Sequence, residues 1–399
     1  MAKKATGKDD GEKYKRIVVK LGTNLLTAGS DRLDLVVMST LVGQVARLHQ
    51  QGRDVLLVTS GAIAAGRQEL GISDGMRDIP CRQAMAAVGQ TALMQSYEQL
   101  FEWHGIKVAQ ALLTRTDLSD RLGYLNARRT LLTLLKLRVL PIINENDVVA
   151  VEELGGASFG DNDNLSGLVT NLVDADLLVL LSDVEGLYTA DPDRDRGATL
   201  IPSVERIDRS IEKLAGGTTG RGRGGMRTKL DAAKLATAAG ATAVIAGGLE
   251  KDVILRVVAG DALGTIFPPT ASKMESRKRW ILSGLATRGS IVVDAGAARA
   301  LKEQNRSLLP AGVKGVEGKF QRGDAVNIVA EAPGAKEKPS KGKKDSKAGA
   351  EYERIGCGIT NYSSKELEAI KGARSDRIEE LLGYAYGEEV VHRNDLVVS

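Results

Sequence analysis

The chain has 399 residues, more than one ordinary domain holds, so two domains are expected. Its formal net charge of +4 is too small to indicate nucleic-acid binding by itself. Its two cysteines are far apart in sequence, which argues against a disulfide framework and indicates a reducing compartment. No apolar run approaches the length of a membrane span, and no apolar signal segment follows Met1. These features predict a cytoplasmic protein without a membrane segment.

Residues 1–14 are mostly polar and charged and are expected to form a disordered tail. From Arg16 onward, apolar strand patterns alternate with amphipathic helical ones. Residues 35–48 have helical spacing, and Gly52 is expected to end that helix. Strands are expected at residues 16–21, 54–60, 107–113, 139–143, 177–181 and 241–246. This alternation predicts an α/β domain over residues 15–275, with an open, mostly parallel sheet sandwiched by helices.

The pattern changes after residues 276–286, which we interpret as a linker. Short strands are expected at residues 290–294 and 324–330, separated by turns that contain Pro and Gly. Short strands at this spacing predict a small β-rich, barrel-like domain over residues 287–399. Residues at about 333–350 are rich in Lys, Pro, Gly and Ser, so they are expected to be a flexible insertion in that domain.

Turns that carry Gly, Asp, Asn or Lys follow the apolar strands of the predicted sheet. In an open α/β sheet, ligands bind outside the carboxyl ends of the strands, where such turns expose backbone N–H groups. Each turn alone could be an ordinary turn or helix cap. Together they predict a site for a polyphosphate and a small polar substrate. The turns lie at residues 22–24, 59–62, 144–147, 160–164, 182–183 and 224–229.

Two lysines in these turns suit phosphoryl transfer. Lys20 ends the first strand just before Gly22, which would let the backbone approach phosphates closely. Lys229 closes a Gly-rich segment at the start of a helix, where N–H groups and the helix dipole favour anions. The spacing is not that of a Walker A loop, and both lysines could be ordinary surface residues. If they converge on one phosphoryl group, they form the electrostatic clamp that its transfer requires.

Three aspartates, Asp147, Asp161 and Asp163, accompany Asn162 in a short stretch of turns. They could hold Mg²⁺ through water, orient the lysines or bind an ammonium group, and Asn162 suits a zwitterion. Ser60-Gly61 is either an anion site for a carboxylate or a simple helix cap. The three histidines lie outside all these turns, so no usual general base is present. A carboxylate acceptor needs none, because it is already ionised at neutral pH.

These residues resemble the amino acid kinase family, specifically the members that phosphorylate the side-chain carboxylate of L-glutamate. The resemblance runs from about Lys15 over nearly the whole chain, and the segment from about Thr287 resembles a PUA domain. It implies an ATP-dependent, Mg²⁺-dependent kinase that makes L-glutamyl 5-phosphate, the first step towards proline. It also implies inhibition by proline and a homodimer or homotetramer. The motifs that carry the resemblance are Val19-Lys20-Leu21-Gly22-Thr23, Thr59-Ser60-Gly61-Ala62, Ile143-Asn144-Glu145-Asn146-Asp147, Gly160-Asp161-Asn162-Asp163-Asn164 and Gly224-Gly225-Met226-Arg227-Thr228-Lys229.

The resemblance also implies roles for single residues. Lys20 and Lys229 would stabilise the transferring phosphoryl group, and Asp163 would organise the two lysines. Mg²⁺ would be bound mainly through ATP, with no protein ligand assigned. Glutamate would be bound by Ser60, Gly61, Asp147, Asp161 and Asn162. The nucleotide would be bound by Lys20, Gly22, Ser182, Asp183, Arg223, Gly224, Gly225, Met226, Arg227, Thr228 and Lys229.

Two alternative functions stay open at this point. One is another kinase of the same family, acting on acetylglutamate, aspartate, carbamate or UMP. Asp147 and Asn162 favour a free amino acid over these acceptors. The other is an RNA-binding protein, because PUA domains elsewhere bind RNA and the Lys-rich insertion could add affinity for phosphates. The six lysines and two acidic residues of 336–347 account for the whole net charge, which argues against RNA binding as the main function.

Overall fold

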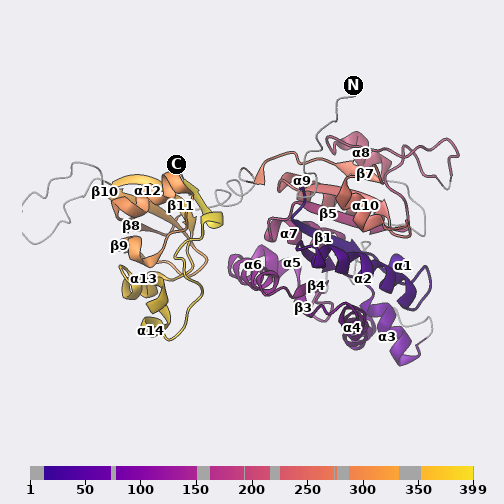
Figure 1. Ribbon diagram of the computed structural model, residues 1–399, viewed down its shortest axis with the longest axis horizontal. Helices are drawn as coiled ribbons and strands as arrows, with labels where there is room; N and C mark the ends of the chain where they lie inside the picture. Colours follow the sequence, from indigo (N-terminus) through magenta and orange to yellow (C-terminus); the bar gives the residue numbers. More distant parts are fainter. Residues whose placement is uncertain are drawn as a thin grey trace, which may run out of the picture. The chain divides into compact units, whose positions relative to one another are not determined.

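The computed structural model of the chain describes residues 13–72, 78–150, 162–192, 194–215, 225–273, 275, 287–331 and 352–398. The chain divides into two compact units, Met1–Lys273 and Met274–Ser399 (Figure 1). The predicted tail, linker and Lys-rich insertion lie almost entirely outside the described residues. Of the helices in this described part, none combines the length and apolar character that a membrane span needs.

The N-terminal unit is built on a seven-stranded sheet with the strand order β3-β4-β2-β1-β5-β6-β7 (Figure 1). Every pairing is parallel except that of β6 with β7. The predicted α/β fold with a mostly parallel sheet is therefore confirmed. The strands are β1 (Arg16–Leu21), β2 (Asp54–Val58), β3 (Val108–Leu113), β4 (Leu140–Glu145), β5 (Leu177–Ser182), β6 (Thr242–Gly247) and β7 (Thr265–Phe267).

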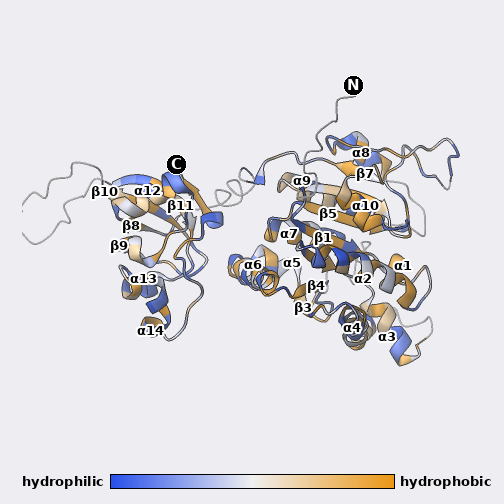
Figure 2. Ribbon diagram, in the orientation of Figure 1, coloured by the Kyte–Doolittle hydropathy of each residue, from blue (hydrophilic) through white to orange (hydrophobic). Residues whose placement is uncertain are grey.

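Helices cover both faces of this sheet. On one face, alternate residues such as Ile17, Val19 and Leu21 share an apolar core with α2, α4 and α10. The residues between them, such as Val18, are equally buried, as the continuous aliphatic strands require, and Figure 2 shows the strands as apolar. The helices are α1 (Thr23–Leu26), α2 (Leu35–Gln50), α3 (Ala62–Leu70), α4 (Ile79–Glu102), α5 (Arg115–Ser119), α6 (Arg121–Lys136), α7 (Asn162–Leu172), α8 (Arg209–Leu214), α9 (Gly225–Ala238) and α10 (Val253–Ala259).

Helices α3 and α4 pack unusually closely through two glycines. A Cβ atom on Gly66 of α3 would lie 1.8 Å from the carbonyl oxygen of Met85. A Cβ atom on Gly89 of α4 would lie 1.8 Å from the carbonyl oxygen of Ala62. No side chain fits at either position, so glycine fixes how near α4 comes to the start of α3.

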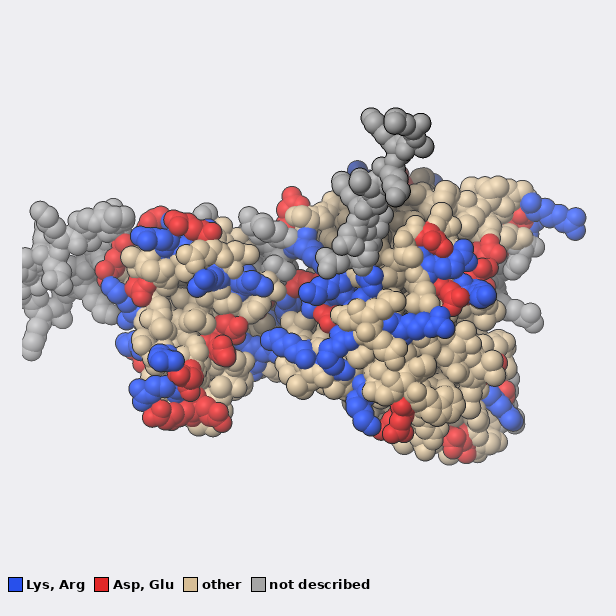
Figure 3. Space-filling view, viewed as in Figure 1, with Lys and Arg blue, Asp and Glu red and all other residues tan. Residues whose placement is uncertain are grey.

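The C-terminal unit has a five-stranded mixed sheet with the order β12-β11-β10-β8-β9 (Figure 1). Strands β8 and β10 are parallel, and the other pairings are antiparallel. One apolar core lies between this sheet and its helices, so the predicted small β-rich domain is present. The elements are β8 (Gly289–Val293), α12 (Ala295–Gln304), β9 (Val313–Gly318), β10 (Ala325–Glu331), β11 (Tyr352–Ile359), α13 (Ser364–Ile370), α14 (Ile378–Leu382) and β12 (Leu396–Val398). On the visible face of each unit, basic and acidic side chains are interspersed (Figure 3).

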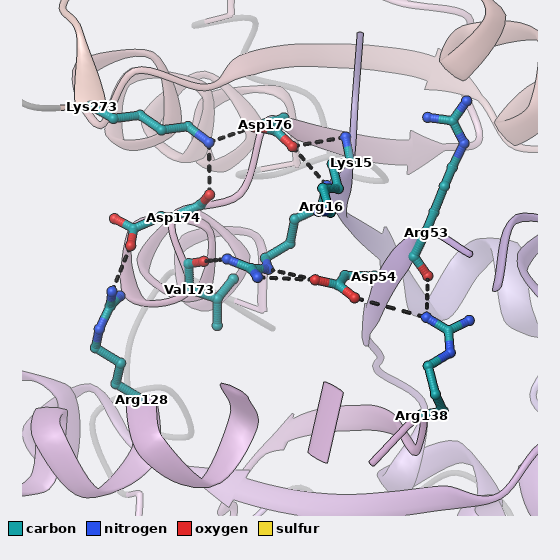
Figure 4. Close-up of polar contacts among 10 residues, drawn as sticks. All are labelled: Lys15, Arg16, Arg53, Asp54, Arg128, Arg138, Val173, Asp174, Asp176 and Lys273. Carbon is teal, nitrogen blue, oxygen red and sulfur yellow. Dashed lines mark hydrogen bonds and ion pairs between the residues drawn. The ribbon is translucent and has the colours of Figure 1, made fainter. Parts of the chain in front are cut away.

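A network of charged groups joins the amino ends of the strands in the N-terminal unit (Figure 4). The Asp176 carboxylate, just before β5, accepts hydrogen bonds from the backbone N–H groups of Lys15 (2.8 Å) and Arg16 (2.7 Å). Its other oxygen lies 2.5 Å from Nζ of Lys273, the last residue of the unit. The Arg16 guanidinium in turn pairs with Asp54 at 2.9 Å. Asp176 thus fastens the first and last segments of this unit to the start of β5.

We expect Asp176→Ala to lower the free energy of unfolding by about 1–3 kcal/mol, because three donors lose a charged acceptor. Urea denaturation of the full chain would measure this loss. Asp31→Ala is the matched control: Asp31 pairs with Arg32 at 3.9 Å, both side chains are exposed, and stability should stay unchanged. Equal stability of Asp176→Ala and the unaltered chain would contradict the fastening role.

Candidate active site

One carboxylate lies between two lysines at the carboxyl ends of the parallel strands. Lys20 Nζ is 2.5 Å from Asp163 Oδ1, and Lys229 Nζ is 3.2 Å from Oδ2. Lys229 also donates to the carbonyl oxygen of Gly225 at 3.1 Å, and the Thr228 hydroxyl donates to Asp163 Oδ2 at 2.7 Å. The three charged side chains are at most 10% exposed. The structure therefore brings Lys20, Lys229 and Asp163 together.

The fold explains why residues so distant in sequence meet here. Lys20 is near the end of β1, which pairs with β2 and β5 at the centre of the sheet. Asp163 is in the first turn of α7, and Lys229 begins the second turn of α9. Helix α7 packs on both α9 and β1, and a Cβ atom on Gly167 would lie only 3.0 Å from the Ala232 carbonyl oxygen. The small residue lets the two helices approach closely enough for Asp163 to reach Lys229.

Lys20, Lys229 and Asp163 form a charged triad, and the two lysines determine the protonation state of the Asp163 carboxyl group. Burial of the Asp163 carboxyl group acts to raise its pKa. The two lysines, together with hydrogen bonds from Lys20 and Thr228, outweigh that effect and hold the pKa below its usual value. Asp163 is therefore ionised at neutral pH. Two ammonium groups share this one carboxylate, so the triad has an excess of positive charge that suits an anion.

Two of the predicted substrate residues, Ser60 and Asn162, are joined by a hydrogen bond, and Asn144 lies beside them. Asn162 Nδ2 donates to Ser60 Oγ at 3.0 Å and to Asn144 Oδ1 at 3.1 Å, and all three side chains are buried. Gly61, which follows Ser60, has φ of +100° at the start of α3, a conformation that favours glycine. Asp147 is half-buried in the turn after β4. Asp161 lies outside the described residues.

The predicted nucleotide residues have more varied surroundings. A Cβ atom on Gly22 would lie 3.4 Å from Lys20 Nζ, so Gly22 is next to the lysine ammonium group. Gly225 and Met226 are half-buried at the start of α9. Arg227 is exposed and lies 3.9 Å from Asp231, one turn further along α9. Arg223 and Gly224 lie outside the described residues.

Ser182 ends β5, Asp183 follows it, and the two form a small polar group with Asn24. Ser182 Oγ donates to Asp183 Oδ1 at 3.0 Å, and Asn24 Nδ2 donates to Oδ2 at 3.1 Å. Burial acts to raise the pKa of Asp183, but these hydrogen bonds outweigh it, so the pKa is lowered. Asp183 is a fixed acceptor at the end of β5.

Four residues near this site were not predicted. Asn24 and Asn144 belong to the predicted turns at residues 22–24 and 144–147, so their position after a predicted strand could have indicated that they lie at the site. Gln90 and Arg82 are buried on α4 and carry no turn signal. Burial lowers the pKa of Arg82, while the negative charge of Asp147 acts to raise it. The two residues therefore interact electrostatically.

Among the described residues, no group of three His, Cys, Asp or Glu side chains lies close enough to hold a metal ion. Both oxygens of Asp163 already face donors, which is unsuited to direct coordination.

Comparison with known proteins identifies the family. Residues 15–247, more than half of the chain, match the model of the amino acid kinase family. This chain belongs to the amino acid kinase family. Residues 289–382 match the PUA domain, so the C-terminal unit of this family member is a PUA domain.

Several curated proteins are similar to this chain over nearly its whole length. A protein of Dehalococcoides mccartyi strain CBDB1, named Glutamate 5-kinase, is 51% identical and covers 96% of this chain and 98% of its own length. Proteins with the same name from Herpetosiphon aurantiacus (50% identical, 97% and 99% covered) and Shewanella oneidensis (49% identical, 96% and 98% covered) are similar. A solved UMP kinase from Bacillus anthracis is 15% identical, with 65% of this chain and 97% of its own covered. Its TM-score of 0.44 is too low to bear on the substrate.

We expect Asp163→Asn to lower the free energy of unfolding at pH 7 by about 3 kcal/mol, because two buried ammonium groups lose their counter-charge. The folded pKa of Asp163 is depressed, so its stabilisation is complete above the unfolded pKa of about 4 and is lost as pH falls through the folded value. The difference from the unaltered chain should therefore shrink on acidification. Urea denaturation at pH 7 and at lower pH measures it.

Asp231→Asn is the control for this experiment, since Asp231 pairs with exposed Arg227 at 3.9 Å. Its stability should match that of the unaltered chain at each pH. A destabilisation by Asp163→Asn that stays constant with pH would show that the carboxylate charge is not what stabilises the triad.

Proposed function

We propose that this chain catalyses the ATP-dependent phosphorylation of the side-chain carboxylate of L-glutamate, giving L-glutamyl 5-phosphate. The observation that carries the proposal is the identity of about half of all residues, over nearly full length, to proteins named Glutamate 5-kinase. The buried triad of Lys20, Lys229 and Asp163 supports it, because phosphoryl transfer depends on positioning and charge neutralisation.

In the proposed reaction, an oxygen of the glutamate carboxylate forms a bond to the γ-phosphorus of ATP. The bond from that phosphorus to the bridging oxygen breaks, and its electron pair leaves on ADP. The attacking carboxylate is ionised at neutral pH, so no proton has to be removed. This fits a site in which no histidine belongs to the motifs.

The lysines would act on the charge that moves in this reaction. Lys20 and Lys229 would donate to the phosphoryl oxygens and offset the negative charge that spreads over them. Asp163 would act through the lysines: it holds both ammonium groups in place before the substrates arrive. Mg²⁺, bound through the phosphates of ATP, would supply further charge neutralisation.

Different turns around the triad would bind the two substrates. The Ser60–Gly61 turn and Asn162 would bind the zwitterionic part of glutamate, and Asp147 and Asp161 would interact with its ammonium group. Gly22, Ser182, Asp183 and the segment from Arg223 to Lys229 would contact the nucleotide. Arg227 would do so with its backbone, since its side chain lies beside Asp231 on the surface of α9.

Two further properties belong to this proposal. We propose feedback inhibition by proline and assembly into a homodimer or homotetramer, both from the resemblance to the family members that phosphorylate glutamate. Inhibition by the end product of the pathway would act at its first committed reaction. Light scattering of the full chain, with and without proline, would measure the assembly.

The test is ATP consumption by the purified chain with Mg²⁺ and hydroxylamine, which traps an acyl phosphate as a hydroxamate. We expect hydroxamate with L-glutamate, suppressed by proline, and none with N-acetylglutamate, L-aspartate, carbamate or UMP. Lys229→Met should abolish the signal, whereas Lys234→Met, at an exposed position further along α9, should retain it. Product from another acceptor in place of glutamate would overturn the substrate assignment.

A further inference from the structure

A chain of buried amide groups links helix α4 to the proposed glutamate site. Asn144 Nδ2 donates to Gln90 Oε1 at 2.7 Å, and Asn162 Nδ2 donates to Asn144 Oδ1 at 3.1 Å. Asn162 Nδ2 also donates to Ser60 Oγ at 3.0 Å. Gln90 is 8% exposed, and the other three side chains are at least as buried. The four residues come from α4, β4, α7 and the turn after β2.

A single backbone group sets the direction of these hydrogen bonds. The backbone N–H of Glu145 donates to Asn144 Oδ1 at 3.0 Å, and an N–H group can only donate. The oxygen of Asn144 therefore faces Glu145 and Asn162, and its NH₂ group faces Gln90. Gln90 must present its oxygen to that NH₂ group. Asn162 must likewise present its NH₂ group to Asn144, which leaves its own oxygen, Oδ1, for another partner.

The remaining polar atoms match a zwitterion. Within the part of the chain that the structure describes, buried Asn162 Oδ1 has no hydrogen-bond partner. It is an acceptor, which suits an ammonium group. Ser60 Oγ accepts from Asn162, so its hydroxyl hydrogen is left to donate to a carboxylate. An acceptor beside a donor is the complement of an amino acid with a free α-amino group.

The helix that carries Gln90 packs directly against the start of α3. The neighbouring Gly89 packs directly on the Ala62 carbonyl at the start of α3, so α4 cannot shift relative to the Ser60–Gly61 turn. The backbone at Gln90 thus lies close to that turn, and Asn144 is held from one side by Glu145 N–H and from the other by Gln90 Oε1. Without Gln90, the Asn144 amide keeps only the contacts of its oxygen and can turn.

We infer that Gln90 is a positioning residue for the substrate: acting through Asn144, it keeps Asn162 Oδ1 directed as an acceptor for the α-ammonium group. This inference rests on the proposed function and names the part of glutamate that the amide chain recognises. Gln90 itself touches neither the phosphoryl group nor the lysine triad in this role. Its loss should weaken glutamate binding and leave ATP binding and turnover nearly intact.

The experiment compares L-glutamate with glutarate, which has both carboxylates but no amino group. Gln90→Met fills the same space without an acceptor for Asn144. We expect it to raise the KM for glutamate about tenfold, the size of one net hydrogen bond, with kcat and the KM for ATP within about twofold. The inhibition constant of glutarate should not change. The ratio of that constant to the glutamate KM should therefore fall about tenfold.

Two further variants separate this role from a structural one. Gln90→Glu keeps an oxygen that accepts from the Asn144 amide. Its ratio of the glutarate inhibition constant to the glutamate KM should therefore stay within about threefold of that of the unaltered chain. Gln95→Met, at an exposed position on the same helix, should not change the ratio at all. If Gln90→Met does not fold, as judged by its thermal melting, Gln90→Ala takes its place.

The outcomes distinguish the two proposals. Suppose that the unaltered chain phosphorylates glutamate. This inference alone is then wrong if Gln90→Met leaves the ratio of the glutarate inhibition constant to the glutamate KM unchanged, or if Gln90→Glu lowers that ratio as far as Gln90→Met does. A chain with no glutamate-dependent hydroxamate overturns the proposed function and this inference with it.

Discussion

The site depends on one electrostatic constraint: two buried ammonium groups must share the single carboxylate of Asp163. A buried charge is costly unless it is paired, so the two lysines and the aspartate stabilise one another. The pairing makes the triad a stable part of the fold. It also leaves one positive charge in excess, which attracts a phosphate group. In the proposed reaction, this excess positive charge would offset the negative charge of the transferring phosphoryl group.

The parallel sheet makes that constraint possible. Parallel strands bring their carboxyl ends to one edge of the sheet. Four neighbouring strands carry a polar residue at or near that end: Lys20, Ser60, Asn144 and Ser182. The charged network around Asp176 occupies the opposite edge and fastens the ends of the same unit (Figure 4). The network around Asp176 and the triad of Lys20, Lys229 and Asp163 therefore lie at opposite ends of the strands.

Much of this arrangement could be predicted from the sequence, for identifiable reasons. The aliphatic run 177–181 has the composition of a strand buried on both faces, and it is the core of β5. The lysines could be assigned to one site because strand ends converge in a parallel sheet. The role of Gln90 could not be found in this way. Its partner Asn144 is 54 residues away, and a glutamine in the middle of a helix carries no turn signal. Strand β7 was missed because three residues are too few for a pattern.

The most direct test of the central claim is a double-mutant cycle in kcat, with Asp163→Asn, Lys229→Met and the two combined. Lys229→Met alone should lower kcat on the order of a hundredfold or more. If Asp163 acts through the lysines, the combined variant should be little slower than the slower single variant. If the fold-loss of kcat in the combined variant equals the product of the two single losses, Asp163 and Lys229 act independently, and the dependence on a shared carboxylate is contradicted.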